Sequence, residues 1–197
     1  MEKKAAIICP ESRDGLEFLS KTTPLVLVPF CGKSLLDHSL TEIASKGYSH
    51  VDLYVSDRPE VIREQVKDGS KWGISISIKP TSREWTPHEI LESKSKESIE
   101  TSEKTTEVFL VDRIPLKHPD PLFSDYKNWF KRLIDYMPIA ATAQIGMTKR
   151  FPNIWIGTGS QVAPTARLNS PCWIGRNVLI GDNAVIGPNT IIEDQCF

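Results

Sequence analysis

The sequence predicts an α/β protein in which a parallel sheet with flanking helices precedes a coil of short repeated strands. Two observations carry this prediction. Short apolar runs alternate with helix-like segments over residues 1–150, and a six-residue pattern fills most of the remainder. Among the 197 residues, 40% are hydrophobic and 25% charged, which is ordinary for a water-soluble chain with a sizeable core.

The first part of the chain follows a β-α-β order. Apolar runs predict strands at 5–8, 51–55, 74–78 and 108–111. Helices are expected at 32–45, 59–67 and 123–137. The stretch 93–106 consists almost entirely of Ser, Thr, Lys and Glu, which predicts an exposed, mobile loop. This alternation favours a parallel sheet with helices on its faces.

The strongest pattern lies between residues 155 and 196. Seven consecutive hexads read WIGTGS, QVAPTA, RLNSPC, WIGRNV, LIGDNA, VIGPNT and IIEDQC. A period of six fits neither a helix nor an ordinary strand, whose side chains repeat at 3.6 and 2 residues. It predicts a coiled ribbon in which one aliphatic side chain per short strand points inward. The inward residues are Ile156, Val162, Leu168, Ile174, Ile180, Ile186 and Ile192.

These hexads resemble the hexapeptide-repeat family, which implies a short left-handed parallel β-helix with three hexads per coil. Seven hexads then make slightly more than two coils, which bury little surface by themselves. Only Phe197 follows the last hexad. We therefore expect another subunit, or a continuation of the chain, to cover an open apolar end.

Two further stretches resemble sugar-phosphate nucleotidyltransferases. Residues 28–38, VPFCGKSLLDH, look like the family segment L-x-P-V-x-G-K-P-L-L-x-H. Residues 67–74, KDGSKWGI, look like its G-D-G-S-x-x-G segment. A nucleotidyltransferase-like domain followed by hexapeptide repeats is also the layout of mannose-1-phosphate guanylyltransferases.

The resemblance implies a Rossmann-like, nucleotidyltransferase-type parallel sheet and three regions. Residues 1–115 form a degenerate nucleotidyltransferase-like α/β domain, 116–150 a connecting helix and linker, and 151–197 the β-helix.

The loop after the first expected strand departs from the family. Active members carry A-A-G-x-G-T-R there, where this chain has CPESRDG at residues 9–15. Glu11 and Arg13 replace both glycines, and Leu25 stands where a second motif places a lysine. These changes remove amide access and positive charge, so we expect affinity for a nucleoside triphosphate to collapse. The candidates for nucleotide contact that remain are Ser12, Arg13 and Gly15.

Other catalytic chemistry is sparse. Asp112 stands roughly where the family places a magnesium-binding aspartate, and Asp135 is the nearby candidate for a second one. We expect Asp112 to be a cap or turn residue otherwise, and Asp135 a solvated helix position. We expect no resident metal or cofactor, with Mg²⁺ only if the protein is catalytically active. All four histidines precede the repeats, which disfavours a hexapeptide acyltransferase with a histidine base.

Composition limits location and partners. A net charge of −1 gives no electrostatic reason to bind nucleic acid, and no apolar run reaches the length of a membrane span. The N-terminus carries no signal-peptide pattern, and four scattered cysteines indicate neither a disulfide framework nor a zinc site. We expect a cytoplasmic protein with buried thiols.

The leading hypothesis is a non-catalytic scaffold or regulatory subunit in sugar-nucleotide or polysaccharide metabolism. It would associate through the β-helix with itself or with another nucleotidyltransferase-like subunit. The alternatives are an active sugar-1-phosphate nucleotidyltransferase (a transferase) with a rearranged phosphate loop, a module that binds a nucleotide sugar, and a hexapeptide acyltransferase.

Overall fold

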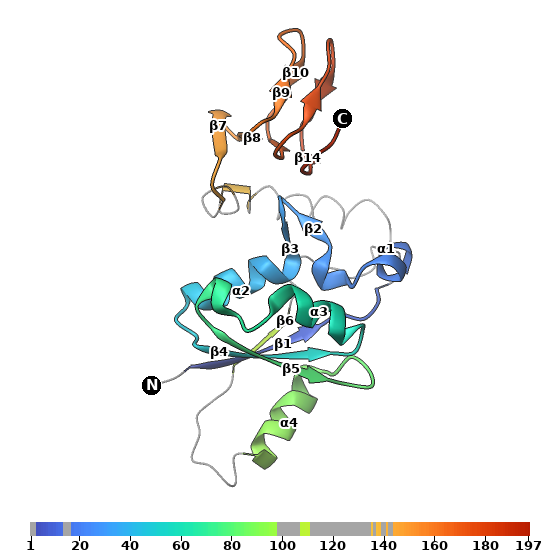
Figure 1. Cartoon of the computed structure of the whole chain (residues 1–197), viewed down its shortest axis with the longest axis vertical. Coiled ribbons are helices and arrows are strands. Elements are labelled where there is room, and N and C mark those ends of the chain that lie inside the picture. The colour runs from blue at the N-terminus through green and yellow to red at the C-terminus, as the bar shows by residue number, and fades with distance from the viewer. Residues whose placement is uncertain are drawn as a thin grey trace. The chain divides into compact units, whose positions relative to one another are not determined.

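The chain has a mixed α/β architecture with two compact units (Figure 1). The computed structural model describes residues 3–13, 17–97, 107–110, 135, 137–138, 141 and 144–197. The first unit comprises Met1–Val28 and Ser34–His118, and the second comprises Pro29–Lys33 and Pro119–Phe197.

A four-stranded parallel sheet forms the core of the first unit. Its strands lie in the order β5-β4-β1-β6. Both β1 and β4 are buried along their length except at the first residue, because helices cover the two faces of the sheet. The predicted parallel sheet is thus confirmed. Its strands are β1 (Lys4–Cys9), β4 (His50–Val55), β5 (Ser75–Pro80) and β6 (Glu107–Leu110).

Helices cover both faces of this sheet. Figure 1 shows α2 (Leu35–Ser45) and α3 (Pro59–Val66) on one face and α4 (Pro87–Glu97) on the other. A capping box begins α2: the Ser34 hydroxyl accepts from the backbone N–H of Asp37, whose carboxylate accepts from the Ser34 N–H. Shorter pieces complete the unit: α1 (Glu17–Thr22), and the 3₁₀ turns Leu25–Leu27 and Ser70–Trp72.

Helix α4 corrects one sequence-based expectation. The predicted loop 93–106 is wrong for Ser93–Glu97, which are helical, while residues 98–106 lie outside the described part of the chain. Tertiary packing overrides the polar composition here. Ile90 is fully buried against Ala6 and Ile8 of β1, and Trp85, just before the helix, packs on the same cluster.

A buried charge also holds α4 to the sheet. Asp52, in the middle of β4, bonds to the ammonium of Lys94 from α4 and lies 3.1 Å from His50 Nε2. Burial raises the pKa of this carboxyl, but the bonds to Lys94 and His50 outweigh burial and leave its pKa below the ordinary value. The ionised form is therefore the one that the fold stabilises.

The second unit contains short strands in several small sheets. A four-stranded sheet has the order β14-β11-β8-β7, with β7 antiparallel to β8, and the pairs β9–β12 and β10–β13 are parallel. The pair β2–β3 is a hairpin. The strands are β2 (Pro29–Phe30), β3 (Lys33–Ser34), β7 (Met147–Phe151), β8 (Ile154–Gly157), β9 (Gln161–Val162), β10 (Arg167–Leu168), β11 (Cys172–Ile174), β12 (Leu179–Ile180), β13 (Val185–Ile186) and β14 (Thr190–Ile192).

The pairing of these strands has a constant offset of three hexads. Ile174 pairs with Ile156 on one side and with Ile192 on the other, so successive strands of that sheet lie 18 residues apart (156, 174, 192). The same offset pairs Ile180 with Val162 and Ile186 with Leu168. All seven predicted inward residues belong to one apolar cluster, which confirms the predicted side-chain register.

Backbone turns between the hexads need special conformations. Asn177, Asn183 and Asn189, each in the fifth position of its hexad, have φ values of 53°, 59° and 61°. Asparagine is among the few non-glycine residues that tolerate this left-handed region. At Gly175 a Cβ would lie 2.6 Å from the backbone nitrogen of Asp194, so only glycine fits at that close approach.

We predict that Ile180→Asp unfolds the repeats. Ile180 is only 6% exposed inside the apolar cluster, and an unpaired carboxylate there should destabilise the unit by about 3 kcal/mol or more. Thermal melting followed by tryptophan fluorescence, with Trp155 and Trp173 as local probes, measures the change.

An exposed position on the paired strand supplies a matched control. Gln161 of β9 pairs with Leu179 of β12 and is exposed, so Gln161→Asp should shift the melting temperature little. Equal melting curves for the two variants would show that the register is wrong.

Candidate functional site

The loop after β1 lies where α/β proteins usually bind ligands. The chain runs from β1 outward through β4 and β5, then returns to place β6 on the other side of β1. The carboxyl ends of β1 and β6 therefore form a topological switch point. Residues 10–13 of the loop are described, whereas Gly15 and Asp112, which follow β1 and β6, lie outside the described residues.

The arginine of this loop is paired within the chain. Arg13 Nη1 donates to Glu84 Oε2 at 2.6 Å, and its Nη2 donates to Glu84 Oε1 at 2.5 Å. The backbone N–H of Glu11 donates to Glu84 Oε2 at 3.0 Å. The carboxylate of Glu84, from the segment between β5 and α4, thus receives three N–H groups from the loop.

These bonds determine the ionisation of the cluster. Burial raises the pKa of Glu84, but the bonds from Arg13 and the Glu11 N–H outweigh burial, so the pKa lies below its ordinary value of 4.5. The stability that the pair adds is present above the ordinary pKa and is lost as pH falls through the lowered one. Burial, assisted by the Glu84 charge, raises the pKa of Cys9 to about 12, so this thiol stays protonated.

The other residues singled out in the sequence offer no cation to a phosphate. Ser12 is exposed, and its carbonyl accepts a hydrogen bond from Arg13 Nη1 at 2.6 Å. Leu25, at the position where the family motif has lysine, is buried at 1% exposure, so this position supplies no cation. Asp135 is exposed and helical.

Two buried hydroxyl groups at the same edge of the sheet have no hydrogen-bond partner among the described residues. The Ser56 Oγ and Thr81 Oγ1 atoms are buried and, in the part of the chain that the structure describes, form no hydrogen bond. Ser56 directly follows β4 and Thr81 directly follows β5, whose last residues pair with each other. Buried polar groups without partners are uncommon, and they deserve a functional explanation.

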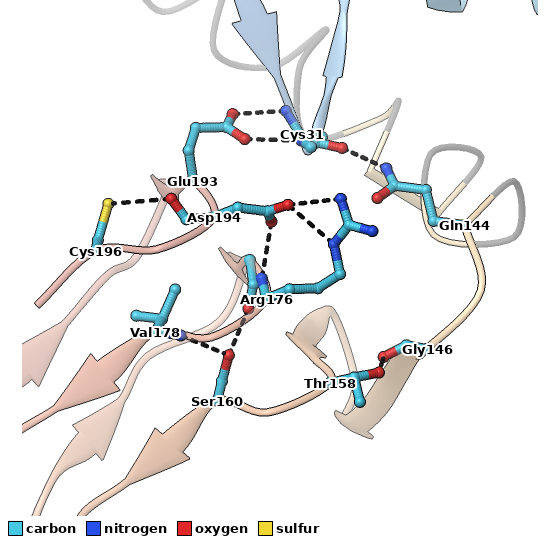
Figure 2. A network of polar contacts seen from close by, with 12 residues as sticks. Cys31, Gln144, Gly146, Thr158, Ser160, Arg176, Val178, Glu193, Asp194 and Cys196 are labelled. Atoms are coloured by element: carbon cyan, nitrogen blue, oxygen red, sulfur yellow. Dashed lines mark hydrogen bonds and ion pairs between the residues drawn. The ribbon is translucent and has the colours of Figure 1, made fainter.

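A second carboxylate cluster lies within the second unit. Glu193 Oε1 accepts from the backbone N–H of Cys31 at 2.6 Å, and its Oε2 accepts from that of Gly32 at 2.7 Å. Figure 2 shows these bonds together with the one from the Gln144 side-chain amide to the Cys31 carbonyl. Cys31 and Gly32 are the two central residues of the β2–β3 hairpin, and both have positive φ, 47° and 74°.

The adjacent turn of the repeats is also held by a carboxylate. Asp194 Oδ1 accepts from the backbone N–H of Arg176 at 2.8 Å, and Oδ2 accepts from the Arg176 guanidinium at 2.9 and 2.6 Å (Figure 2).

Burial raises the pKa of Glu193, and the charge of Asp194 adds to this effect. The two hairpin N–H groups lower the pKa but do not outweigh burial, so the pKa of Glu193 lies above its ordinary value.

Sequence reasoning missed both Glu84 and Glu193. Glu84 carried no motif, and its role depends on a pairing across 71 residues. Glu193 did leave a signal, because the third hexad position is otherwise occupied by glycine, alanine or asparagine. A single glutamate in that column indicates a side chain with a partner outside the repeat.

Comparison with known proteins adds no family assignment: no protein-family model matches the chain, and no curated protein matches it. In the described residues, no group of three or more His, Cys, Asp or Glu side chains is arranged to hold a metal ion. No helix among them is both long enough and apolar enough to cross a membrane.

We predict that Glu193→Ala destabilises the protein by about 1–3 kcal/mol, because two partly buried N–H groups of the hairpin lose their acceptor. Alanine already occupies the same hexad position at residue 163, so the repeat itself tolerates it. Urea unfolding measures the loss. Asp182→Asn, which removes the same charge at an exposed position of the repeats, is the control. If Glu193→Ala lowers the free energy of unfolding no more than this control does, the role of Glu193 as acceptor for the hairpin is contradicted.

Proposed function

We propose that this chain is a nucleotidyltransferase-like protein that has lost nucleotide turnover and acts by association. It would be a cytoplasmic scaffold or regulatory subunit of sugar-nucleotide or polysaccharide metabolism. One observation carries the proposal: in the described part of the loop after β1, the Arg13 guanidinium and the Glu11 N–H, which could bind a phosphate, are bonded to the chain's own Glu84 carboxylate.

Charge adds to this argument. Residues 9–16 contain one cation, Arg13, and two carboxylates, Glu11 and Asp14. With Glu84 paired to Arg13, the surroundings of the loop favour a cation over a triphosphate. A triphosphate would have to displace a bidentate partner and approach a loop whose sequence has more carboxylates than cations. This is the opposite of the glycine-rich, basic loop that phosphate binding usually requires.

The second part of the proposal concerns the repeats. We propose that the three parallel strand sets with an 18-residue offset are the faces of a left-handed parallel β-helix. Apolar side chains on its outer positions support association with a second copy or with another nucleotidyltransferase-like subunit. Leu179, Val185 and Phe197 are 51%, 66% and 94% exposed.

A second candidate is a module that holds a nucleotide sugar without turnover. The buried hydroxyls of Ser56 and Thr81 favour it, because they have no acceptor in the described structure and lie at the edge of the sheet where α/β proteins usually bind ligands. An active sugar-1-phosphate nucleotidyltransferase would additionally need Mg²⁺ and a cation to replace the one held by Glu84.

We predict that calorimetric titration of the purified protein with GTP, with and without Mg²⁺, shows no micromolar binding. UDP-glucose and GDP-mannose are titrated in parallel. Triphosphate binding coupled to pyrophosphate release from a sugar 1-phosphate would overturn the proposal. Binding of a nucleotide sugar without turnover would instead favour the second candidate.

Sedimentation velocity tests the association half of the same proposal. The wild-type chain should sediment as more than a monomer, and the double variant Leu179→Asp, Val185→Asp should shift toward the monomer because charge replaces exposed apolar surface. A wild-type monomer at high concentration would count against self-association.

A further inference from the structure

We propose that the Glu84 carboxylate occupies an anion-binding site formed by Arg13 and the backbone N–H of Glu11. Once this carboxylate is removed, the same groups bind a phosphate-class anion. The inference deepens the proposed loss of nucleotide binding. It rests on that proposed function only in assuming that the wild-type loop, with Arg13 bonded to Glu84, does not bind phosphate. It adds that three N–H donors of the loop, two from Arg13 and one from Glu11, are still arranged to bind an anion.

The anion-binding site is defined by three donors and two acceptor oxygens. The two Arg13 nitrogens reach different Glu84 oxygens, at 2.6 and 2.5 Å, which is the parallel fork in which guanidinium groups bind carboxylates and phosphates alike. The backbone N–H of Glu11 adds a third bond at 3.0 Å, to the oxygen that Arg13 Nη1 also contacts. Two oxygens of a phosphate can accept from the two Arg13 nitrogens in the same parallel geometry, so a phosphate can take the place of the carboxylate.

The segment that carries Glu84 is anchored on its C-terminal side. Trp85 stacks on Tyr54 of β4, with ring centroids 5.4 Å apart. Thr86 and Glu89 form a capping pair at the start of α4: the Glu89 carboxylate accepts from the Thr86 N–H at 2.8 Å.

A second anchor involves Arg83. Its guanidinium is bonded to the Glu89 carboxylate and, at 3.1 Å, to the Glu84 carbonyl. Glu84 is therefore presented to the loop from a fixed backbone. A tethered partner has an effective concentration in the millimolar range or above, which free phosphate must exceed before it can compete.

The chemistry at the edge favours phosphate over a carboxylate ligand. A carboxylate has no oxygen left after it fills the Arg13 fork, whereas a phosphate has two. The buried hydroxyls of Ser56 and Thr81 come from the ends of the neighbouring strands β4 and β5 and have no acceptor within the described structure. They are unused donors at the same sheet edge, and this is a second observation that points to a tetrahedral anion.

The test compares two substitutions that remove the same charge from the same cluster. Glu84→Ala vacates the donors, whereas Glu11→Ala removes a loop carboxylate but leaves the Glu11 N–H and the Glu84 contact in place. Binding of inorganic phosphate is measured by calorimetry at constant ionic strength, with acetate as the competing ligand class.

We expect Glu84→Ala to bind phosphate at least about 10-fold more tightly than the wild type, and Glu11→Ala to match the wild type. Adding Arg13→Gln to Glu84→Ala should abolish the gain, because the guanidinium fork is then absent. An equal gain in Glu11→Ala would overturn the proposal, since bulk charge would then explain it. Acetate binding as tight as phosphate binding would overturn the ligand class.

Circular dichroism melting establishes that each variant is folded. If Glu84→Ala does not fold, Glu84→Gln, which is neutral and equal in size, is expected to show a smaller gain, and a folded Glu84→Gln without any gain contradicts the inference. The two proposals fail separately. GTP binding by the wild type would contradict only the proposed function. A folded Glu84→Ala variant that binds phosphate no more tightly than the wild type would contradict only this inference.

Discussion

The carboxylate of Glu84 is the constraint on which the functional reading of this fold depends. The loop after β1 lies at a topological switch point, where α/β proteins usually bind ligands. The Arg13 guanidinium and the Glu11 N–H in this loop bond instead to a carboxylate that lies 71 residues after Arg13 in the chain. A topology typical of ligand binding and an internally bonded loop therefore coexist in one protein.

The second unit uses carboxylates in the same way. Glu193 fills the amide turn of the β2–β3 hairpin, and Asp194 joins two successive turns of the repeats through Arg176. Both carboxylates accept hydrogen bonds from backbone N–H groups. Together with the apolar cluster of the seven hexads, these contacts hold a unit whose individual strands are only two to five residues long.

Much of the backbone could be predicted because its signals are local. The hexads repeat an inward aliphatic residue, and all seven of these residues reach the common cluster. The buried strands β1 and β4 are continuous apolar runs. Helix α4 was missed because its polar composition argues for a loop. Long-range contacts stabilise it instead: Ile90 and Trp85 pack against β1 and β4, and Lys94 bonds to Asp52. The Glu84 contact was equally inaccessible, since no spacing rule links residues 13 and 84. The asparagines in the fifth hexad position, by contrast, were a readable signal for the left-handed turns.

The central claim is that Glu84 is ionised and bound to Arg13 in solution, and its pKa tests this most directly. NMR titration of the Glu84 side-chain carboxyl carbon should give a midpoint below the ordinary 4.5 in the wild type. In Arg13→Gln the cation that lowers the pKa of Glu84 is absent while burial still raises it, so the midpoint should rise. A wild-type midpoint at or above the ordinary value, unchanged by Arg13→Gln, would contradict the account.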